Sequence, residues 1–418
     1  MNSATNLESK IREANQEVVK RMVSSRCYLT DVKRAGDVID GLKPHTIFHS
    51  GPHVEWKRMA GPMRSSMIAA MLFEGWAKTP NEAVRKAEQG EVKFDSSLDH
   101  NAISCLCGAT SESMPVFEVE NRTFGNKAYI ALPELGMQFG RYDTKTLDNL
   151  VWVKEILAPT LRDALGELGG LEMEPIISQA LLMGDECHDR TVAASCLFQR
   201  TIAPSVVNVS DKKTAIQVLK YMAGIDLFFL WPIMARAKAV ADAAHGVEYS
   251  TITSFLAGNG TEMGLKVSSL GHQWFKAPSP TFYVAKYNEG FSDKDSNPEV
   301  GDSILVDMQG LGGGAMAAGI AHVLSTGDSA DDAIRYSREM MRISVGKNSY
   351  FRIPVLNFEG TPVGVDIRKV LETGISQVCA VGIAHNKPGV GLIGFGMVRV
   401  PMACYQSSYE AFNKKYEG

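Results

Sequence analysis

The chain has 418 residues and a mass of 45.5 kDa, a length that favours two or three domains over a single core. Its 43 basic and 47 acidic residues give a net charge of −4, which gives no reason to expect nucleic acid or a membrane surface as a partner. The seven cysteines form no C-x-x-C pair, so we expect reduced thiols in a cytoplasmic protein.

The first part of the chain predicts a mixture of helices and strands. A charged amphipathic helix carries an apolar stripe from Leu7 to Met22 and lacks the apolar run of a signal peptide. The capping box T-P-N-E at 79–82 predicts the start of a helix that Gly90 ends. Two alternating segments, 115–121 and 127–133, flank a Gly/Asn turn and predict a hairpin.

From residue 144 to about residue 244 the spacing of apolar residues is helical, with a kink expected at Pro159. The most apolar stretch of the chain lies here, and Asp226, Pro232 and Arg236 interrupt it before it is long enough to span a bilayer. We therefore expect a buried helix in this stretch and a helical middle domain.

After Glu248 strand patterns return and alternate with helices. The expected strands lie within 263–268, 281–287, 303–308 and 351–358, and the expected helices at 314–325, 329–344 and 402–415. The prediction is an α+β, multidomain fold, with two α/β-type segments flanking an all-helical middle domain. Its boundaries are 1–143, 144–247 and 248–418, and the pattern leaves open whether the outer segments share a sheet.

The run M-G-D-E-C-H-D-R at 183–190 concentrates groups that can move protons or bind anions. Those candidates are Asp185, Glu186, His188 and Arg190. We expect Gly184 to end one helix and Asp185 to cap the next, which would place Asp185, His188 and Asp189 on one face and make Glu186 and Arg190 a surface pair. An acid/base site, a metal site and a plain charged helix cap remain open from these residues alone.

A second candidate is the segment S-I-L-V-D-M-Q-G-L-G-G-G at 303–314, which predicts a strand, a glycine run and a helix. The glycines are Gly310, Gly312, Gly313 and Gly314. A helix N-terminus after such a run can bind phosphate or carboxylate, and close packing of a small-residue helix on a sheet is the alternative. The G-x-G-x-x-G at 389–394 leads into a strand instead of a helix, so no dinucleotide or other cofactor is predicted.

Five scattered residues complete the candidates. His100 is a further proton carrier, Arg64 and Arg368 are possible carboxylate ligands, Asn259 lies in a G-N-G turn, and His385 lies beside the glycine-rich bend. Each has a structural alternative: an isolated histidine, a surface ion pair between Arg368 and Glu372, or an ordinary hairpin turn.

Several motifs in order extend from about Ser50 to Tyr405. They read G-P-x-x-x-W-x-x-M-x-G-P-M, L-F-E-G-W-A-K, M-G-D-E-x-H-x-R, G-N-G, V-S-x-L-G-x-x-W-F, N-P-x-x-G-D-S, D-I-R-x-V-x-E-T-G and G-I-A-H. With them the chain resembles the YlbE-type family. That family's motif leaves the positions of Cys187 and Asp189 free, which weakens a metal site and leaves an acid/base role for Asp185, Glu186 and His188.

The resemblance implies an α+β fold with a helical insert, and a subunit of an oxamate carbamoyltransferase of anaerobic allantoin breakdown, a purine-degradation pathway. The implied reaction turns oxalurate and phosphate into oxamate and carbamoyl phosphate. The implied partners are an acyl-CoA-synthetase-like subunit, a further small-family subunit in an oligomeric complex, and small anionic substrates. The usual carbamoyltransferase signatures S-x-R-T-R and H-P-x-Q are absent. A non-catalytic scaffold subunit and a metal-dependent hydrolase are the alternatives.

Overall fold

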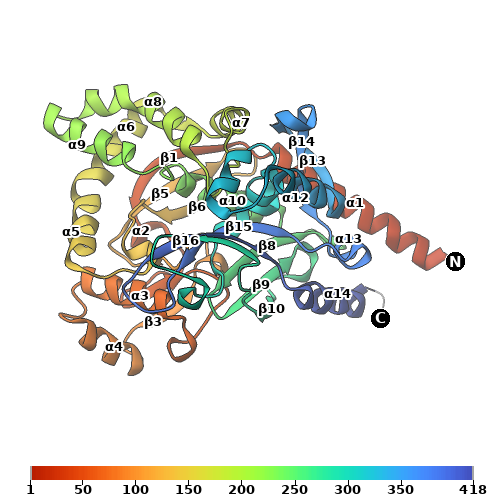
Figure 1. Cartoon of the computed structure of the whole chain (residues 1–418), viewed down its shortest axis with the longest axis horizontal. Coiled ribbons are helices and arrows are strands. Elements are labelled where there is room, and N and C mark those ends of the chain that lie inside the picture. Colours follow the sequence, from red (N-terminus) through yellow and green to blue (C-terminus); the bar gives the residue numbers. More distant parts are fainter. Residues whose placement is uncertain (1, 417–418) are drawn as a thin grey trace.

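The computed structural model describes residues 2–416 and shows helices packed around several small sheets (Figure 1). In the first segment the elements are α1 (Asn2–Ser24), β1 (Cys27–Arg34), α2 (Ala35–Val38), β2 (Thr46–His49), α3 (Gly61–Phe73), α4 (Pro80–Glu88), β3 (Lys93–Ser96), β4 (Ala109–Thr110), β5 (Pro115–Asn121) and β6 (Asn126–Ala131). The expected helix stripe and hairpin are confirmed, since Ile11, Val18 and Met22 are buried and β5 pairs with β6. Thr79 caps α4 as expected, but the Glu82 carboxylate accepts the backbone N–H of Lys78 instead of that of Thr79, so the capping box is only half formed.

The middle segment is mostly helical. It contains α5 (Thr144–Trp152), a π-helical turn (Val153–Leu157), α6 (Ala158–Leu168), β7 (Leu171–Glu172), α7 (Glu174–Leu182), α8 (Val192–Val209), α9 (Lys212–Ala223) and α10 (Leu230–Ala244). The prediction of an all-helical segment is wrong at one point, because the two-residue strand β7 pairs with β1 and completes the sheet β6-β5-β1-β7. The apolar stretch forms the expected buried helix, α10.

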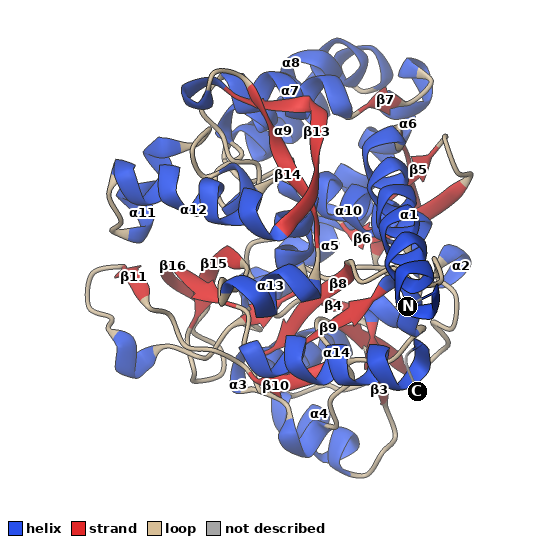
Figure 2. Ribbon diagram, turned by 90° about the vertical axis from the view of Figure 1, so that its right-hand side faces the viewer, coloured by secondary structure: helices blue, strands red, loops and turns tan. Residues whose placement is uncertain are grey.

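The last segment contains β8 (Thr253–Asn259), β9 (Glu262–Val267), β10 (Phe275–Pro278), β11 (Val284–Tyr287), β12 (Val300–Gly301), α11 (Val323–Thr326), α12 (Ala330–Ile343), β13 (Ser344–Ile353), β14 (Glu359–Val365), α13 (Ile367–Thr373), β15 (Val378–Ala384), β16 (Leu392–Arg399) and α14 (Met402–Tyr416). Its sheets have the orders β10-β9-β8-β12, β11-β16-β15 and β13-β14, and no described sheet joins the two outer segments. Figure 2 shows α12 beside the long β13–β14 hairpin.

The expected strand at 303–308 and helix at 314–325 are wrong. Three short 3₁₀ turns occupy this stretch, at Ser303–Gln309, Gly312–Ala315 and Ile320–His322, before the four-residue helix α11. Gly310 and Gly312 adopt positive φ angles of 82° and 50°, which interrupt both helix and strand. The whole stretch from Ser303 to Ala317 is buried, so its apolar pattern reflects burial and not strand alternation.

One hydrophobic cluster of buried residues draws on all three segments of the chain. Helix α10 lies near the centre of the molecule, in contact with β5 and β6 of the first segment (Figure 1). Its buried Arg236 donates to Glu174 at 3.1 Å and to Gln309 at 3.1 Å, and so links the middle segment to the last. The boundaries 1–143, 144–247 and 248–418 stay a prediction. None of the helices in residues 2–416 combines the length and the apolar character needed to cross a membrane.

Candidate functional site

The run 183–190 is a loop between α7 and α8, not the first turn of a helix. Gly184, with a φ of 97°, ends α7 as expected, but Cys187 also has a positive φ of 64° and α8 begins only at Val192. Asp185 still serves the N-terminus of α8, because its carboxylate accepts the backbone N–H of Ala194 at 2.9 Å. The expected capping role of Asp185 is therefore present, while the expected shared helix face is not.

Glu186 is fully buried and shapes this loop from within. Its two carboxylate oxygens accept the backbone N–H groups of His188 at 2.8 Å and Arg190 at 2.6 Å. The expected surface pair between Glu186 and Arg190 is wrong, because the carboxylate bonds to the Arg190 backbone and is shielded from solvent. Burial raises the pKa of Glu186 well above its usual value.

His188 forms a buried ion pair with Asp307, which the 3₁₀ turn Ser303–Gln309 supplies. The distance from Nδ1 to the Asp307 carboxylate is 2.7 Å, and the two side chains are 1 % and 0 % exposed. Burial disfavours the imidazolium, but the charges of Asp307 and Asp189 outweigh it and raise the pKa of His188 to about 10. His188 is therefore a cation at neutral pH, held away from solvent.

Asp189 connects this ion pair to a second histidine. One of its carboxylate oxygens lies 3.9 Å from Nε2 of His188, and the other lies 3.7 Å from Nε2 of His322. Burial raises the pKa of Asp189 to about 6, and the positive charge of His188 partly offsets that effect. Burial and the same cation lower the pKa of His322 to about 3, so His322 is neutral at physiological pH.

Asp189 and His322 open onto a cavity of about 520 Å³, called here the His322 cavity. Its lining comes from the 183–190 loop, the α9–α10 connection, the start of α11 and β16. The lining residues are Leu135, Phe139, Arg141, Asp189, Arg190, Val192, Gly224, Ile225, Asp226, Leu227, His322, Ser325, Val390, Leu392 and Phe395. His188 lies behind Asp189 and is not part of the lining.

Two arginines supply positive charge to the His322 cavity. Arg190 donates from Nε to the backbone oxygen of Gly184 at 3.0 Å, and within residues 2–416 its terminal nitrogens make no hydrogen bond. Arg141 binds Asp143 through Nε and one terminal nitrogen, which leaves its other terminal nitrogen free among the described residues. Arginine nitrogens of this kind are suited to carboxylate or phosphate groups.

The described residues contain no group of three or more His, Cys, Asp or Glu side chains placed to hold a metal ion. The cluster around His188 is arranged as ion pairs and backbone hydrogen bonds instead. The arrangement is therefore suited to proton transfer and anion binding.

The glycine run lies beside this cluster but differs from its expected form. The N–H of Gly312 donates to the backbone oxygen of Glu186 at 2.8 Å, and the N–H of Gly313 donates to Asp307. A Cβ at Gly312 would collide with the Asp307 carboxylate, and one at Gly310 with Thr361. Gly310 and Gly314 are buried with them. These glycines allow close packing under the cluster, and no helix N-terminus follows the run to hold an anion.

His100 and Arg64 lie outside the His322 cavity. His100 stacks on Phe48 and its Nε2 lies 3.1 Å from Asp95, at the edge of a separate cavity of about 350 Å³. Arg64 donates to the backbone oxygens of Trp56 and Lys57 and so fixes the loop before α3. The structure does not bring either side chain to the cluster.

The remaining candidates also have structural contacts. Asn259 closes the turn between β8 and β9 by accepting two backbone N–H groups. Arg368 pairs with Glu8 at 2.9 Å and not with Glu372 as expected. His385 accepts the backbone N–H two residues ahead of it. None of the three lines the His322 cavity.

Sequence reasoning missed four contributors to this site: Asp307, His322, Arg141 and the cavity position of Asp189. Asp307 and His322 flank the glycine run that the sequence singled out, so both lie beside a recognisable motif. Their partners in the 183–190 run are distant from them in the sequence. The contact between residues 185–190 and residues 307–322 exists only in the folded chain.

A sequence model of the family described as "Oxamate carbamoyltransferase subunit AllG" matches residues 92–303. The Escherichia coli K12 protein named "Oxamate carbamoyltransferase subunit AllG" is 38% identical over 410 residues, covering 96% of this chain and 98% of its own. The "Uncharacterized protein YahG" of the same organism is 36% identical over 414 residues, covering 98% and 88%. A crystal structure of a conserved protein of unknown function from Enterococcus faecalis V583 superposes with a TM-score of 0.96 at 35% identity, covering 98% of this chain and 99% of the other.

Proposed function

Since this chain belongs to the family of the oxamate carbamoyltransferase subunit AllG, we propose that it is the subunit of such an enzyme that carries the transfer site. The proposed reaction converts oxalurate and phosphate into oxamate and carbamoyl phosphate. The observation that supports a catalytic role is the meeting of Asp189, His322 and Arg190 at one cavity.

The reaction needs three things from the protein. Phosphate and the substrate carboxylate need cationic donors, the tetrahedral intermediate needs a donor for its oxyanion, and one proton must move from phosphate to the leaving nitrogen. Arg190 and Arg141 supply the cations on the wall of the His322 cavity. The neutral imidazole of His322 supplies an N–H donor without adding charge.

Asp189 is the proposed proton carrier, because a pKa of about 6 lets it exist in both protonation states near neutral pH. A phosphate oxygen attacks the carbamoyl carbon of oxalurate and forms a C–O bond while Asp189 accepts the phosphate proton. The intermediate then collapses, the C–N bond to oxamate breaks, and Asp189 returns the proton to the oxamate nitrogen. His188, buried behind it, positions Asp189 by charge and does not touch substrate.

The test measures carbamoyl phosphate formed from oxalurate and phosphate. It uses this chain alone and the chain together with the two subunits that the family resemblance implies, one acyl-CoA-synthetase-like and one from a further small family. Asp189→Asn should lower the turnover of the active mixture by about 10²- to 10⁴-fold, the usual contribution of general acid/base catalysis.

The matched control is Asp163→Asn, the same change at an exposed helix position paired with Arg162. The control should retain full activity. Full activity of an intact complex that contains Asp189→Asn would remove the chemistry from this cavity and leave this chain a scaffold subunit. The metal-dependent hydrolase has no supporting cluster among the described residues.

A further inference from the structure

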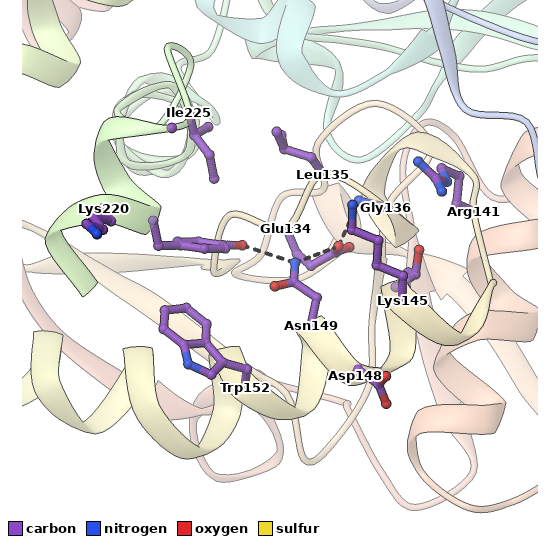
Figure 3. Close-up of a pocket in the computed structure, with 13 residues that line it drawn as sticks. Glu134, Leu135, Gly136, Arg141, Lys145, Asp148, Asn149, Trp152, Lys220 and Ile225 are labelled. Carbon is purple, nitrogen blue, oxygen red and sulfur yellow. Dashed lines mark hydrogen bonds between the residues drawn. The ribbon is translucent and has the colours of Figure 1, made fainter. Parts of the chain in front are cut away.

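A second cavity adjoins the His322 cavity and shares Arg141 with it. It measures about 690 Å³ and lies between α5, α9 and the loop 134–141 (Figure 3). We call it the Trp152 cavity. Its lining residues are Glu134, Leu135, Gly136, Arg141, Lys145, Thr146, Asp148, Asn149, Trp152, Lys220, Tyr221, Gly224 and Ile225. The volume lies within the range of sites that hold drug-sized and cofactor-sized molecules.

One face of α5 forms much of this lining. Lys145, Asn149 and Trp152 follow one another at helical spacing of four and three residues, so they align along the cavity. Lys145 and Trp152 are about 10 Å apart along the helix axis at 1.5 Å per residue. A cation and an aromatic ring therefore occupy opposite ends of one surface.

The helix changes directly after Trp152. Residues Val153–Leu157 form a π-helical turn, and Pro159, which has no N–H to donate, lies just beyond it. Turns of this kind are rare and occur frequently at functional sites. The turn is thus an observation that points to this face of α5 independently of the cavity.

The aromatic end of the cavity is pre-arranged. Trp152 and Tyr221 lie with their ring centroids 4.7 Å apart at 42°. The Tyr221 hydroxyl donates to the backbone oxygen of Pro133 and accepts from the Asn149 amide, which also donates to Glu134 at 3.0 Å. Figure 3 shows Asn149 and Glu134 lying between Trp152 and Lys145. The rings are therefore held in place without a ligand.

The charge of the cavity favours an anion. Neither Lys145 nor Lys220 has an ion-pair partner within residues 2–416, and Arg141 adds a third cation that is partly offset by Asp143. Glu134 is buried and its carboxylate accepts three hydrogen bonds, so protein donors satisfy its charge, and burial raises its pKa. Asp148 is the one exposed carboxylate in the lining.

We propose that the Trp152 cavity binds an organic phosphate that carries a planar aromatic ring, as a nucleotide does. The ring lies against the Trp152–Tyr221 pair, and the phosphates reach Lys145, Lys220 and Arg141. Base–aromatic stacking tolerates different bases, so this geometry selects the class and not one base. The inference does not depend on the transfer reaction, because Trp152, Lys145 and Lys220 line this cavity alone and nucleotide binding is a separate measurement.

The experiment is calorimetric titration of the full-length protein with ADP, GDP and UDP, with inorganic phosphate and adenosine as partial ligands. At least one nucleotide should bind more tightly than either partial ligand. Trp152→Ala should weaken that binding roughly 5- to 150-fold, the fold-change equivalent to loss of one base–aromatic stack. Trp152→Phe, which keeps an aromatic face, should retain most of it.

Lys145→Ala combined with Lys220→Ala should weaken nucleotide binding and reduce its dependence on salt. The control is Lys154→Ala, which removes one lysine charge from the π-helical turn next to α5; the Lys154 side chain faces Phe73 and Ser113 outside the cavity. Failure of all three nucleotides to bind at millimolar concentration would overturn the proposal. Equal affinity for phosphate and nucleotide, or unchanged binding in the double lysine variant, would overturn it as well.

Discussion

The ion pair between His188 and Asp307 leads to a specific prediction about stability. Replacing His188 by leucine keeps a side chain of similar size but leaves the Asp307 carboxylate without its cation. The two groups lie 2.7 Å apart and are 1 % and 0 % exposed, so water cannot replace the lost partner. Breaking a buried pair of this kind costs about 3–5 kcal/mol, and we expect His188→Leu to lose that much free energy of unfolding.

The matched control removes both charges. In His188→Leu combined with Asp307→Asn, the new amide oxygen still accepts the backbone N–H of Gly313, and position 307 no longer carries an unpaired charge. The double variant should therefore recover much of the loss, because an uncharged pair avoids the cost of desolvation. Urea denaturation followed by circular dichroism gives the comparison, with a change in midpoint and little change in slope.

The same reasoning predicts how the difference in stability between the wild type and the double variant changes with pH. The pKa of His188 is about 10 in the folded protein, above the value of about 6.5 expected when unfolded. Its contribution to stability is therefore fully present below pH 6.5 and is lost as the pH rises through 10. The advantage of the wild type over the double variant should shrink between pH 6 and pH 9. A single variant as stable as the double one, or an advantage that grows with pH, would refute the reasoning.

Four further outcomes follow from the site. Wild-type transfer activity should rise with pH through about 6, because Asp189 must lose its proton to act as a base, and Asp189→Asn should lack that dependence. His188→Leu should shift this rise in activity to higher pH, because it removes the cation that lowers the pKa of Asp189 and leaves Asp307, which raises that pKa. A pH–rate profile with an unchanged rise would contradict this coupling. Arg190→Ala should raise the KM for an anionic substrate with a smaller effect on kcat, measured by steady-state kinetics. Gly312→Ala should lower the free energy of unfolding by about 1–3 kcal/mol in urea, because it strains a positive φ and meets the Asp307 carboxylate.

The elements that sequence predicted well depend on local signals. The apolar stripe of α1, the Thr79 cap of α4 and the β5–β6 hairpin each follow from residues within a few positions of one another. The turn that Asn259 closes and the end of α7 at Gly184 follow in the same way. In these places local preference and tertiary structure agree.

The strand and helix predicted within 303–324 were wrong for a physical reason. The residues from 303 to 317 are all buried, so alternation does not report strand geometry, and the glycines of this stretch serve close contact with Asp307 and the Glu186 loop. The prediction of the site was also incomplete, because it lacked a contact between distant segments. The sequence identified both the 183–190 run and the glycine segment. It did not show that Asp307, from the glycine segment, neutralises His188, from the 183–190 run.

That neutralisation decides which residue of the run can exchange protons. His188 keeps its proton at neutral pH because Asp307 and Asp189 stabilise the cation, and it is shielded from the cavity. Glu186 is fully occupied by backbone N–H groups, so it too has no route to a substrate. Asp189 alone among these three carboxylate and imidazole groups combines a pKa near neutrality with a position on the cavity wall. A histidine that looks catalytic in sequence therefore becomes, in the folded chain, the group that tunes its acidic neighbour.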